Sequence, residues 1–233
     1  QSTRLPGKPL ADIDGRPMIE HVYRRATEAR SLSEVLVATD DERIAAAVDA
    51  FGGIAVMTRT DHRSGTDRLA EVAASLESEI LVNVQGDLPF IPAAPIDDTI
   101  ALVEARSELG MGTLRRRISD AAELSRPSVV KVVVDTRGDA LYFSRTALPH
   151  VRVGQPTPVF WKHIGLYVYR RDFLLRLAGL PPTPLERTES LEQLRALEHG
   201  FKIGTVETNT DTIEIDTPED LERGRRLVEA VRS

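Results

Sequence analysis

The sequence predicts an α/β protein with a mostly parallel, twisted sheet that carries helices on both faces. Helix and strand patterns alternate through the first two-thirds of the chain. The strand segments there are apolar nearly throughout, which is typical of strands buried on both faces. After about residue 110 the strand patterns alternate instead, which indicates a smaller antiparallel β insertion.

The first half of the chain contains three helix patterns and three strand patterns. The expected helices are 17–29, 41–51 and 66–76, and the expected strands are 34–39, 54–57 and 80–84. The pair Gly52-Gly53 ends the second helix. A parallel sheet ordinarily opens with a strand, whereas this sequence opens in a loop with Gly and Pro. We therefore expect a preceding strand of about 5–10 residues.

The second half favours strands. The expected strands are 111–117, 129–134, 140–144, 161–169 and 203–206, and the expected helices are 188–199 and 218–231. Asp135-Thr136-Arg137-Gly138 is an expected hairpin turn. The loop from Leu148 to Pro158 holds three prolines, so we expect it to be mobile or to face substrate.

Composition excludes several functional classes. The chain has 233 residues, 41% of them hydrophobic, and a net charge of -6. This charge opposes binding to duplex DNA or to anionic membranes, and no apolar run reaches the length of a membrane helix. Cysteine is absent, which excludes disulfides, thiol catalysis and cysteine-zinc sites. We expect a cytoplasmic protein with no nucleic-acid partner and no membrane insertion.

The segment Ser2-Thr3-Arg4-Leu5-Pro6-Gly7-Lys8-Pro9-Leu10 places two cations four residues apart in a loop. A glycine-containing turn exposes main-chain N–H groups to an anion, and Arg4 and Lys8 add positive charge. It is not a Walker A loop, because Pro9 stands where that loop has Ser or Thr. The segment indicates either a phosphate-binding loop or a basic surface turn.

Asn83-Val84-Gln85-Gly86-Asp87 ends a buried strand with polar side chains. Ligands of open α/β sheets bind beyond the carboxyl ends of the strands. A carboxylate there suits Mg²⁺, which takes one or two protein carboxylates and completes its shell with phosphate and water. The alternative is an aspartate that only shapes a turn.

Asp216-Thr217-Pro218-Glu219-Asp220 reads as a helix start. Thr217 fits the N-cap, Pro218 the first helical position and Asp220 the acid of a capping box. If Thr217 caps the helix, Asp216 is free to turn toward a metal. The residues alone favour the other option, in which Asp216 is itself the cap.

Trp161 to Tyr169 alternates with a period of two, which places His163, Gly165, Tyr167 and Tyr169 on one face. Such a face beside a pocket suits a polyhydroxy or acidic substrate, and an ordinary half-exposed strand gives the same pattern. The segment Leu191-Glu192-Gln193-Leu194 is equally open. Its polar residues are either ligands of a substrate or the solvated face of a helix.

Together these segments resemble a known family. The chain carries, in this order, STRLPGKPL, VATDD, MTRTDHRSGTDRLAE, VNVQGD, YFSR, HIGLYVY, LEQLR and IDTPEDLE. This order is similar to that of the 3-deoxy-manno-octulosonate cytidylyltransferases, the CMP-Kdo synthetases of Gram-negative bacteria. The resemblance runs from residue 1 to about residue 225.

The resemblance implies a nucleotide-diphospho-sugar transferase fold, a homodimer and a part in lipopolysaccharide synthesis. The implied reaction moves CMP from CTP to the anomeric 2-hydroxyl of 3-deoxy-D-manno-octulosonate (Kdo) and releases pyrophosphate. The implied cofactor is Mg²⁺, held by Asp87 and Asp216. We expect one domain, with a nucleotide-binding half at 1–109 and a sugar-binding and dimerisation half at 110–233.

The resemblance also implies roles for single residues. Arg4 and Lys8 are expected to hold the triphosphate and, with Asp87 and Asp216, to be catalytic. The nucleotide site would add Arg59 and the turn Ser64-Gly65-Thr66-Asp67 near the cytosine, with Asp87 also in contact. The expected Kdo-binding residues are Gln85, Arg145, His163, Tyr167, Glu192 and Gln193. Arg145 is the natural partner of the Kdo carboxylate, because a guanidinium binds a carboxylate as a fork.

Two of the sequence's departures from the family concern the metal site and the sugar. Leu88 stands where the family usually has Glu, which alters metal affinity if that acid supports the metal site and changes nothing if it faces solvent. The loop Leu148 to Pro158 is shorter than in some relatives. These departures leave open a same-fold cytidylyltransferase for 8-amino-Kdo or a sialic-acid-like sugar. A non-catalytic nucleotide-binding relative is the other alternative, opposed by the presence of Lys8, Asp87 and Asp216.

Overall fold

The computed structural model describes residues 5–62, 64–210 and 212–232. The chain forms two compact units that are interleaved along the sequence. The first unit is drawn from 1–62, 84–97 and 211–233, and the second from 63–83 and 98–210. The compact units therefore do not follow a division at residue 109, and the assignment of a nucleotide half and a sugar half stays a prediction.

Among its described residues, the first unit holds short strands, three α-helices and a short 3-10 helix, η1. Its elements are η1 (Lys8–Leu10), β1 (Asp12–Ile13), β2 (Arg16–Pro17), α1 (Met18–Thr27), β3 (Val37–Thr39), α2 (Glu42–Ala50), β4 (Ala55–Met57) and α9 (Pro218–Arg232). Strands β1 and β2 pair antiparallel, and β3 and β4 pair parallel. The expected helices and strands of this region are all present, with ends shifted by a few residues.

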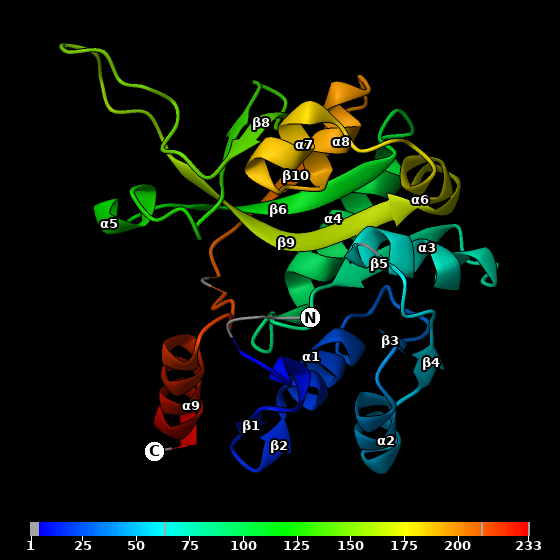
Figure 1. Ribbon diagram of the computed structural model, residues 1–233. Coiled ribbons are helices and arrows are strands. Elements are labelled where there is room, and N and C mark those ends of the chain that lie inside the picture. The colour runs from blue at the N-terminus through cyan, green and yellow to red at the C-terminus, as the bar shows by residue number, and fades with distance from the viewer. Residues whose placement is uncertain (1–4, 63, 211, 233) are drawn as a thin grey trace. The chain divides into compact units, whose positions relative to one another are not determined.

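The core of the first unit joins the two ends of the chain. Ile13 and Met18 are fully buried against Ile213, Ile215 and Leu221, which come from the other end of the sequence. In Figure 1 the blue N-terminal segment accordingly lies beside the red helix α9. This apolar contact holds the loop at Lys8 and the segment at Asp216 in one place.

The second unit contains the larger sheet. Its elements are α3 (Gly65–Ala74), β6 (Met111–Arg117), α5 (Ala121–Leu124), β7 (Lys131–Val134), β8 (Ala140–Ser144), β9 (Trp161–Arg170), α6 (Arg171–Ala178), α7 (Pro184–Glu189), α8 (Gln193–Glu198) and β10 (Ile203–Thr208). Two further elements, β5 (Ile80–Val84) and α4 (Ala93–Ala105), have residues in both units.

The α/β class is confirmed, with a mixed central sheet. The described strands of the second unit follow the order β10-β6-β9-β7-β8, and β5 also pairs with β9. Among these five described strands, β6 and β10 pair parallel. Strand β9 pairs antiparallel with both β6 and β7, and β7 pairs antiparallel with β8. The hairpin of β7 and β8 turns at Gly138, where φ is 83°, as expected for the turn at 135–138.

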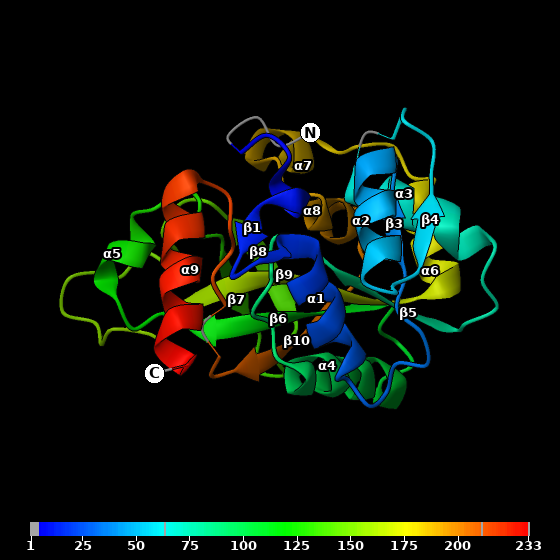
Figure 2. The same ribbon diagram turned by 90° about the horizontal axis from the view of Figure 1, so that it is seen from below.

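Helices cover both faces of this sheet. Figure 2 shows α4 on one side and α7 and α8 on the other. On the α4 side, glycines let the helix approach closely: a Cβ at Gly204 would lie 2.5 Å from Leu109 and 2.9 Å from Leu102. On the other side, Phe143 and Tyr169 pack with Leu194 in one apolar core. The long connection between β8 and β9 extends away from the sheet in Figure 1.

The expected helix 188–199 is wrong, because the chain breaks there into α7 and α8. Ser190 has φ 53°, a left-handed conformation that ends a helix. The first of the two helices also begins earlier, at Pro184, where the Thr183 N–H donates to the Glu186 carboxylate at 3.0 Å. Thr-Pro-Leu-Glu is the sequence signature of this start. The helices α4, α5 and α6 were not anticipated, although Ile96, Ile100 and Val103 have helical spacing.

A buried ion pair ties α7 to α8. Arg195 Nε donates to a carboxylate oxygen of Glu186 at 2.9 Å, and both side chains are more than nine-tenths buried. Burial alone would raise the pKa of Glu186, but the hydrogen bonds from Arg195 and the Thr183 N–H outweigh it and lower the pKa. The stabilisation that this carboxylate provides is therefore present above its ordinary titration range and is lost as the pH falls.

We expect Arg195→Met to lower the free energy of unfolding by about 3–5 kcal/mol at pH 7, because it leaves Glu186 buried without its cation. The loss shrinks toward pH 3.5, where protonation neutralises Glu186. Urea denaturation at the two pH values measures both effects. The control is Arg25→Met, which breaks an exposed pair with Glu28 and is expected to cost under about 1 kcal/mol. An equal loss in the two variants would contradict a stabilising role of the buried pair.

Candidate active site

The first unit gathers three of the expected catalytic residues. The Lys8 ammonium nitrogen lies 2.8 Å from Asp87 Oδ2 and 3.0 Å from Asp216 Oδ1. We call Lys8, Asp87 and Asp216 the lysine–carboxylate cluster. Its members are up to 208 positions apart in sequence, so only the folded first unit brings them together.

Local structure fixes each member of this cluster. Gly7 has φ 69° and turns the chain into η1, which begins at Lys8. The Asp87 carbonyl accepts the Ile215 N–H at 2.9 Å, which ties the turn after β5 to the residue preceding Asp216. The position of Asp87 is therefore coupled to that of Asp216 through the main chain.

The start of α9 leaves Asp216 available. Asp220 N–H donates to Thr217 Oγ1 at 3.2 Å, and Thr217 N–H donates to the Asp220 carboxylate at 3.0 Å. This is a capping box with Thr217 as the N-cap. The option favoured by the residues alone, with Asp216 as the cap, is wrong, and the Asp216 carboxylate instead accepts from Lys8.

The two carboxylates of the cluster could hold a divalent cation. Two carboxylates converge on one point, and a cationic nitrogen already lies there, within 3.0 Å of both. Among the described residues no group of three or more His, Cys, Asp or Glu forms a metal site. A cation with few protein ligands, such as Mg²⁺, fits two carboxylates better than one that needs a closed protein cage.

Lys8 stays charged in this setting. Burial favours the neutral amine, but Asp87 and Asp216 outweigh burial and raise the pKa of Lys8 above its ordinary value. The cluster therefore contains one cation and two carboxylates, and Lys8 can serve as a fixed positive charge toward an anion.

Leu88 follows Asp87 and is fully buried. Its N–H donates to the Gln85 carbonyl at 3.1 Å, and its carbonyl accepts the Ile91 N–H at 3.3 Å. The residue is thus an interior part of the turn after β5. Its hydrocarbon side chain supplies no oxygen to a metal, and the position does not face solvent in this chain.

The other residues expected to bind the nucleotide differ in their exposure and in their hydrogen bonds. Arg4 lies outside the described residues. Arg59 is 68% exposed and pairs with Asp61 at 3.5 Å. In the second unit, Ser64 is the N-cap of α3 and accepts the Asp67 N–H at 3.1 Å, and Gly65 is the first helical residue.

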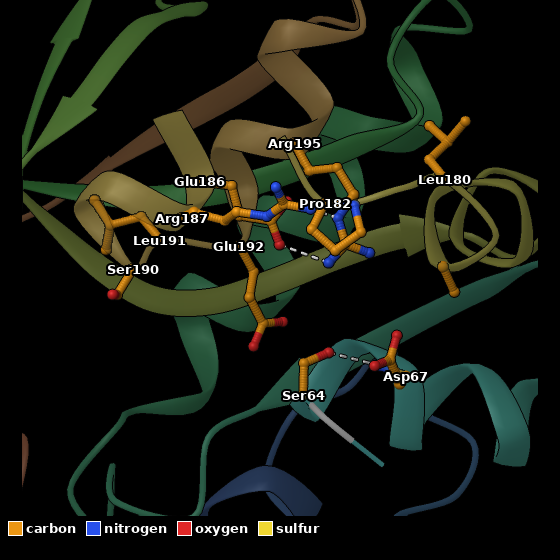
Figure 3. Close-up of a pocket in the computed structure, with 11 residues that line it drawn as sticks. Ser64, Asp67, Leu180, Pro182, Glu186, Arg187, Ser190, Leu191, Glu192 and Arg195 are labelled. Atoms are coloured by element: carbon orange, nitrogen blue, oxygen red, sulfur yellow. Dashed lines mark hydrogen bonds and ion pairs between the residues drawn. The ribbon is translucent and has the colours of Figure 1, made fainter. Parts of the chain in front are cut away.

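Glu192 contacts the start of α3. Its carboxylate accepts the Thr66 hydroxyl at 2.6 Å and lies 3.4 Å from the Thr66 N–H. In Figure 3 the Glu192 carboxylate points toward Ser64 across the pocket. The side chain remains exposed, so it can also meet a ligand.

His163 and Tyr167 lie in a row of rings on β9. The ring centroids of His163 and Tyr167 are 5.5 Å apart, and those of Tyr167 and Tyr169 are 5.9 Å apart. Thr113 donates its hydroxyl to the Leu166 carbonyl at 2.7 Å, so its oxygen accepts a hydrogen from His163 Nε2 at 2.9 Å. Burial, with a smaller effect of Lys162, lowers the pKa of His163 to about 3. His163 is therefore neutral.

Gln193 carries an unused donor. The residue is 5% exposed, and its Nε2 is buried with no hydrogen-bond partner among the described residues. Buried amides are nearly always paired in folded proteins. This unpaired amide lies at the start of α8, next to Glu192.

Arg145 is held by main-chain carbonyls. Its guanidinium donates to Glu189 O at 2.8 Å, Pro127 O at 3.1 Å and Ser190 O at 3.3 Å. Within the described part of the chain, the guanidinium makes no ion pair with a carboxylate, although the Arg145 main-chain N–H donates to the Glu189 carboxylate at 3.0 Å. The guanidinium therefore keeps its positive charge without a carboxylate partner among the described residues, and its role toward a sugar carboxylate stays a prediction.

The second unit also contains a pocket of about 410 Å³ (Figure 3). Its lining residues are Ser64, Asp67, Ala178, Leu180, Pro182, Glu186, Arg187, Ser190, Leu191, Glu192 and Arg195. Ser64 and Glu192 were expected at a site. Arg187 and the Glu186–Arg195 pair were not expected there. A single helix over 188–199 has no bend at Ser190, and that bend helps to form the lining of the pocket.

Comparisons with known proteins identify relatives of this chain. A family model described as "Cytidylyltransferase" matches residues 1–203. The 3-deoxy-manno-octulosonate cytidylyltransferase of Geobacter metallireducens is 54% identical, over 95% of this chain and 91% of the relative. The protein of that name from Solibacter usitatus is 52% identical, over 98% and 91%.

Solved structures show the same similarity. A CMP:2-keto-3-deoxy-manno-octonic acid synthetase complexed with CTP superposes with a TM-score of 0.93 at 48% identity, over 99% of this chain and 95% of that one. A glucose-1-phosphate thymidylyltransferase from Bacillus anthracis has a TM-score of 0.69 at 16% identity, over 97% and 90%, which shows a shared fold. The chain belongs to the 3-deoxy-manno-octulosonate cytidylyltransferase family of nucleotidyltransferases.

Proposed function

We propose that the chain transfers CMP from CTP to the anomeric 2-hydroxyl of Kdo and releases pyrophosphate, as a step of lipopolysaccharide synthesis. The observation that carries this proposal is the lysine–carboxylate cluster, in which one ammonium lies within 3.0 Å of two carboxylates. Such a set suits a triphosphate and a divalent cation. Relatives and a CTP-bound structural neighbour with cytidylyltransferase and synthetase names support the choice of substrates.

The nucleotide is bound through charge and main-chain contacts. Lys8, with Arg4, contacts the triphosphate oxygens, and Asp87 and Asp216 hold Mg²⁺. A bound Mg²⁺ would neutralise phosphate charge and lower the pKa of a coordinated hydroxyl. Arg59, Ser64 and Gly65 contact the cytidine. None of the described helices combines the length and apolarity needed to cross a membrane, and we propose that the enzyme works in the cytoplasm.

The sugar acid is bound by residues with complementary donors and acceptors. Arg145 takes the carboxylate, and the unpaired Gln193 amide donates to a sugar oxygen. Neutral His163 keeps its Nε2 hydrogen on Thr113, so its second ring nitrogen can only accept. Tyr167, Glu192 and Gln85 contact the remaining hydroxyls.

The reaction is an in-line displacement. The 2-hydroxyl oxygen of Kdo forms a bond to the α-phosphorus while the bond from that phosphorus to the pyrophosphate oxygen breaks. Negative charge grows on the phosphate oxygens and the leaving group, so positioning and electrostatic stabilisation dominate. Lys8 stabilises that charge, and Asp216 is the nearest candidate in the cluster to accept the hydroxyl proton.

Leu88 motivates an alternative acid sugar, such as 8-amino-Kdo. The chain has leucine at this buried position, which would alter metal affinity if the family's acid supports the metal site. We also propose a homodimer, which light scattering of the purified protein would test.

We expect Asp87→Asn and Asp216→Asn each to lower pyrophosphate release by about 10²–10³-fold, because each removes charge stabilisation from the reacting phosphates. A coupled pyrophosphate assay with CTP, Kdo and a Mg²⁺ titration measures this. The matched control is Asp172→Asn at a side chain that is 98% exposed, with unchanged turnover expected. Full Mg²⁺-dependent turnover by Asp87→Asn would overturn the metal assignment.

We expect Arg145→Met to raise the KM for Kdo by about 10–100-fold, since a hydrogen bond to a charged group contributes about 1.5–3 kcal/mol. The KM for CTP should change less than about twofold. Steady-state kinetics with each substrate varied separately gives both values. A loss confined to the KM for CTP would place Arg145 at the nucleotide instead.

A substrate panel tests the reaction itself. We expect pyrophosphate release with CTP and Kdo, and none when UTP, ATP or GTP replaces CTP or when the sugar is omitted. Preference for 8-amino-Kdo or sialic acid would keep the chemistry and change the sugar. No release with any pair from a folded protein would favour a non-catalytic relative, and Leu88→Glu would then be the first reversion to test.

A further inference from the structure

Lys131 is a fully buried lysine on β7. The chain has only four lysines, and a buried one is expensive unless its ammonium hydrogens are bonded. Lys131 Nζ donates to Arg126 O at 2.8 Å and to Arg145 O at 2.9 Å. No carboxylate among the described residues bonds to this nitrogen, so its partners are two main-chain carbonyls.

These two carbonyls belong to the two chain segments that position Arg145. Arg126 precedes Pro127, whose carbonyl accepts from Arg145 Nη1 at 3.1 Å. Lys131 thus bonds to both segments involved: the segment at Arg126–Pro127, whose Pro127 carbonyl accepts a hydrogen bond from Arg145, and the segment that carries the Arg145 guanidinium. The β-sheet register places Lys131 directly opposite Ser144, the residue before Arg145.

Glu189 holds the other side of Arg145. Its carboxylate accepts the Ser144 hydroxyl at 2.6 Å and the Arg145 N–H at 3.0 Å, and its carbonyl accepts from Arg145 Nε at 2.8 Å. The next carbonyl, of Ser190, accepts from Nη2 at 3.3 Å. Ser190 has a left-handed backbone, and that bend turns its carbonyl toward the guanidinium.

The arrangement leaves Arg145 with two N–H donors that bond to no described residue. A guanidinium has five N–H donors. Nε, Nη1 and Nη2 each donate once to a carbonyl, so one N–H remains on each terminal nitrogen. Two donors on the two terminal nitrogens are what a bidentate carboxylate requires.

Charge in this group also favours an anion. Lys131 and Arg145 contribute two cations, and Glu189 contributes one carboxylate. Burial, followed by the charge of Arg145, lowers the pKa of Lys131, while Glu189 opposes the shift. An added carboxylate would relieve the repulsion between the two cations.

We propose that Lys131, together with Glu189, is a positioning residue that aims the Arg145 fork at the carboxylate of the sugar acid. Lys131 acts through the carbonyls of Arg126 and Arg145 and does not contact the substrate. The inference rests on the proposed function, in which Arg145 binds the Kdo carboxylate.

The test compares Lys131→Met with Lys131→Arg. Methionine keeps most of the apolar stem but loses the ammonium donors, whereas arginine keeps a cationic donor group. We expect Lys131→Met to raise the KM for Kdo about 10-fold and to change the KM for CTP less than about twofold, with Lys131→Arg recovering much of the loss. Lys202→Met, at an exposed lysine, is the matched control and should leave both constants unchanged.

A Kdo analogue with a neutral C1 carboxamide separates aiming from general packing. In the wild-type chain the acid should be strongly preferred over the amide. In Lys131→Met that preference should shrink about 10-fold, because a displaced Arg145 guanidinium no longer distinguishes the carboxylate from the carboxamide. An unchanged acid-to-amide ratio, or equal rises in both KM values, would overturn the proposal.

Two further variants keep the outcomes distinct. If Lys131→Met fails to fold in a thermal melt, Glu189→Gln is measured in the same way and should show the same reduced preference. If Arg145→Met leaves the KM for Kdo unchanged, the proposed carboxylate contact is wrong, and this inference falls with it. If Arg145→Met raises that KM and neither Lys131→Met nor Glu189→Gln does, only the positioning role is wrong.

Discussion

The attraction between one ammonium and two carboxylates organises the first unit. Asp87 and Asp216 would repel each other at this separation without Lys8. The apolar contact of Ile13 and Met18 with Ile213 and Ile215 supplies the rigidity that holds the three side chains together. Neither part suffices alone, because the core fixes the backbone and the ion pairs fix the side chains. A site with opposed charges already in place needs little rearrangement to receive a polyanion and its cation.

In the second unit, hydrogen bonds and backbone conformation, rather than ion pairs, position the polar side chains. Its polar groups are aimed by main-chain carbonyls and by unusual backbone geometry. Thr113 fixes which nitrogen of His163 carries the hydrogen, and Ser190 turns its carbonyl toward Arg145. Positions set by backbone atoms change little with surface sequence, which suits residues that must discriminate one anionic group from another.

Sequence reasoning predicted the fold class and most strands, because continuous apolar runs and alternating runs report burial directly. It singled out Lys8 and Asp87 by their place in a glycine turn and at a strand end, and the family resemblance then assigned their expected roles. Sequence reasoning failed where contacts between distant parts of the chain determine the local structure. Whether Asp216 or Thr217 caps α9 depends on Lys8, some 208 positions away, which draws the Asp216 carboxylate away from the helix. The break at Ser190 and the support of Arg145 by Lys131 likewise arise only after β7, β8 and α7 have packed.

The interleaving of the two units sets an order of events during synthesis. The segments of the second unit have all been translated by residue 210, whereas the core of the first unit waits for Ile213, Ile215 and Leu221. A chain emerging from the ribosome can therefore complete its larger sheet while Ile13 and Met18 still lack their partners. Lys8 meets its second carboxylate only after that final segment arrives. The nascent protein accordingly completes the lysine–carboxylate cluster last, and the early apolar residues of the first unit are the part that a chaperone would have to shield.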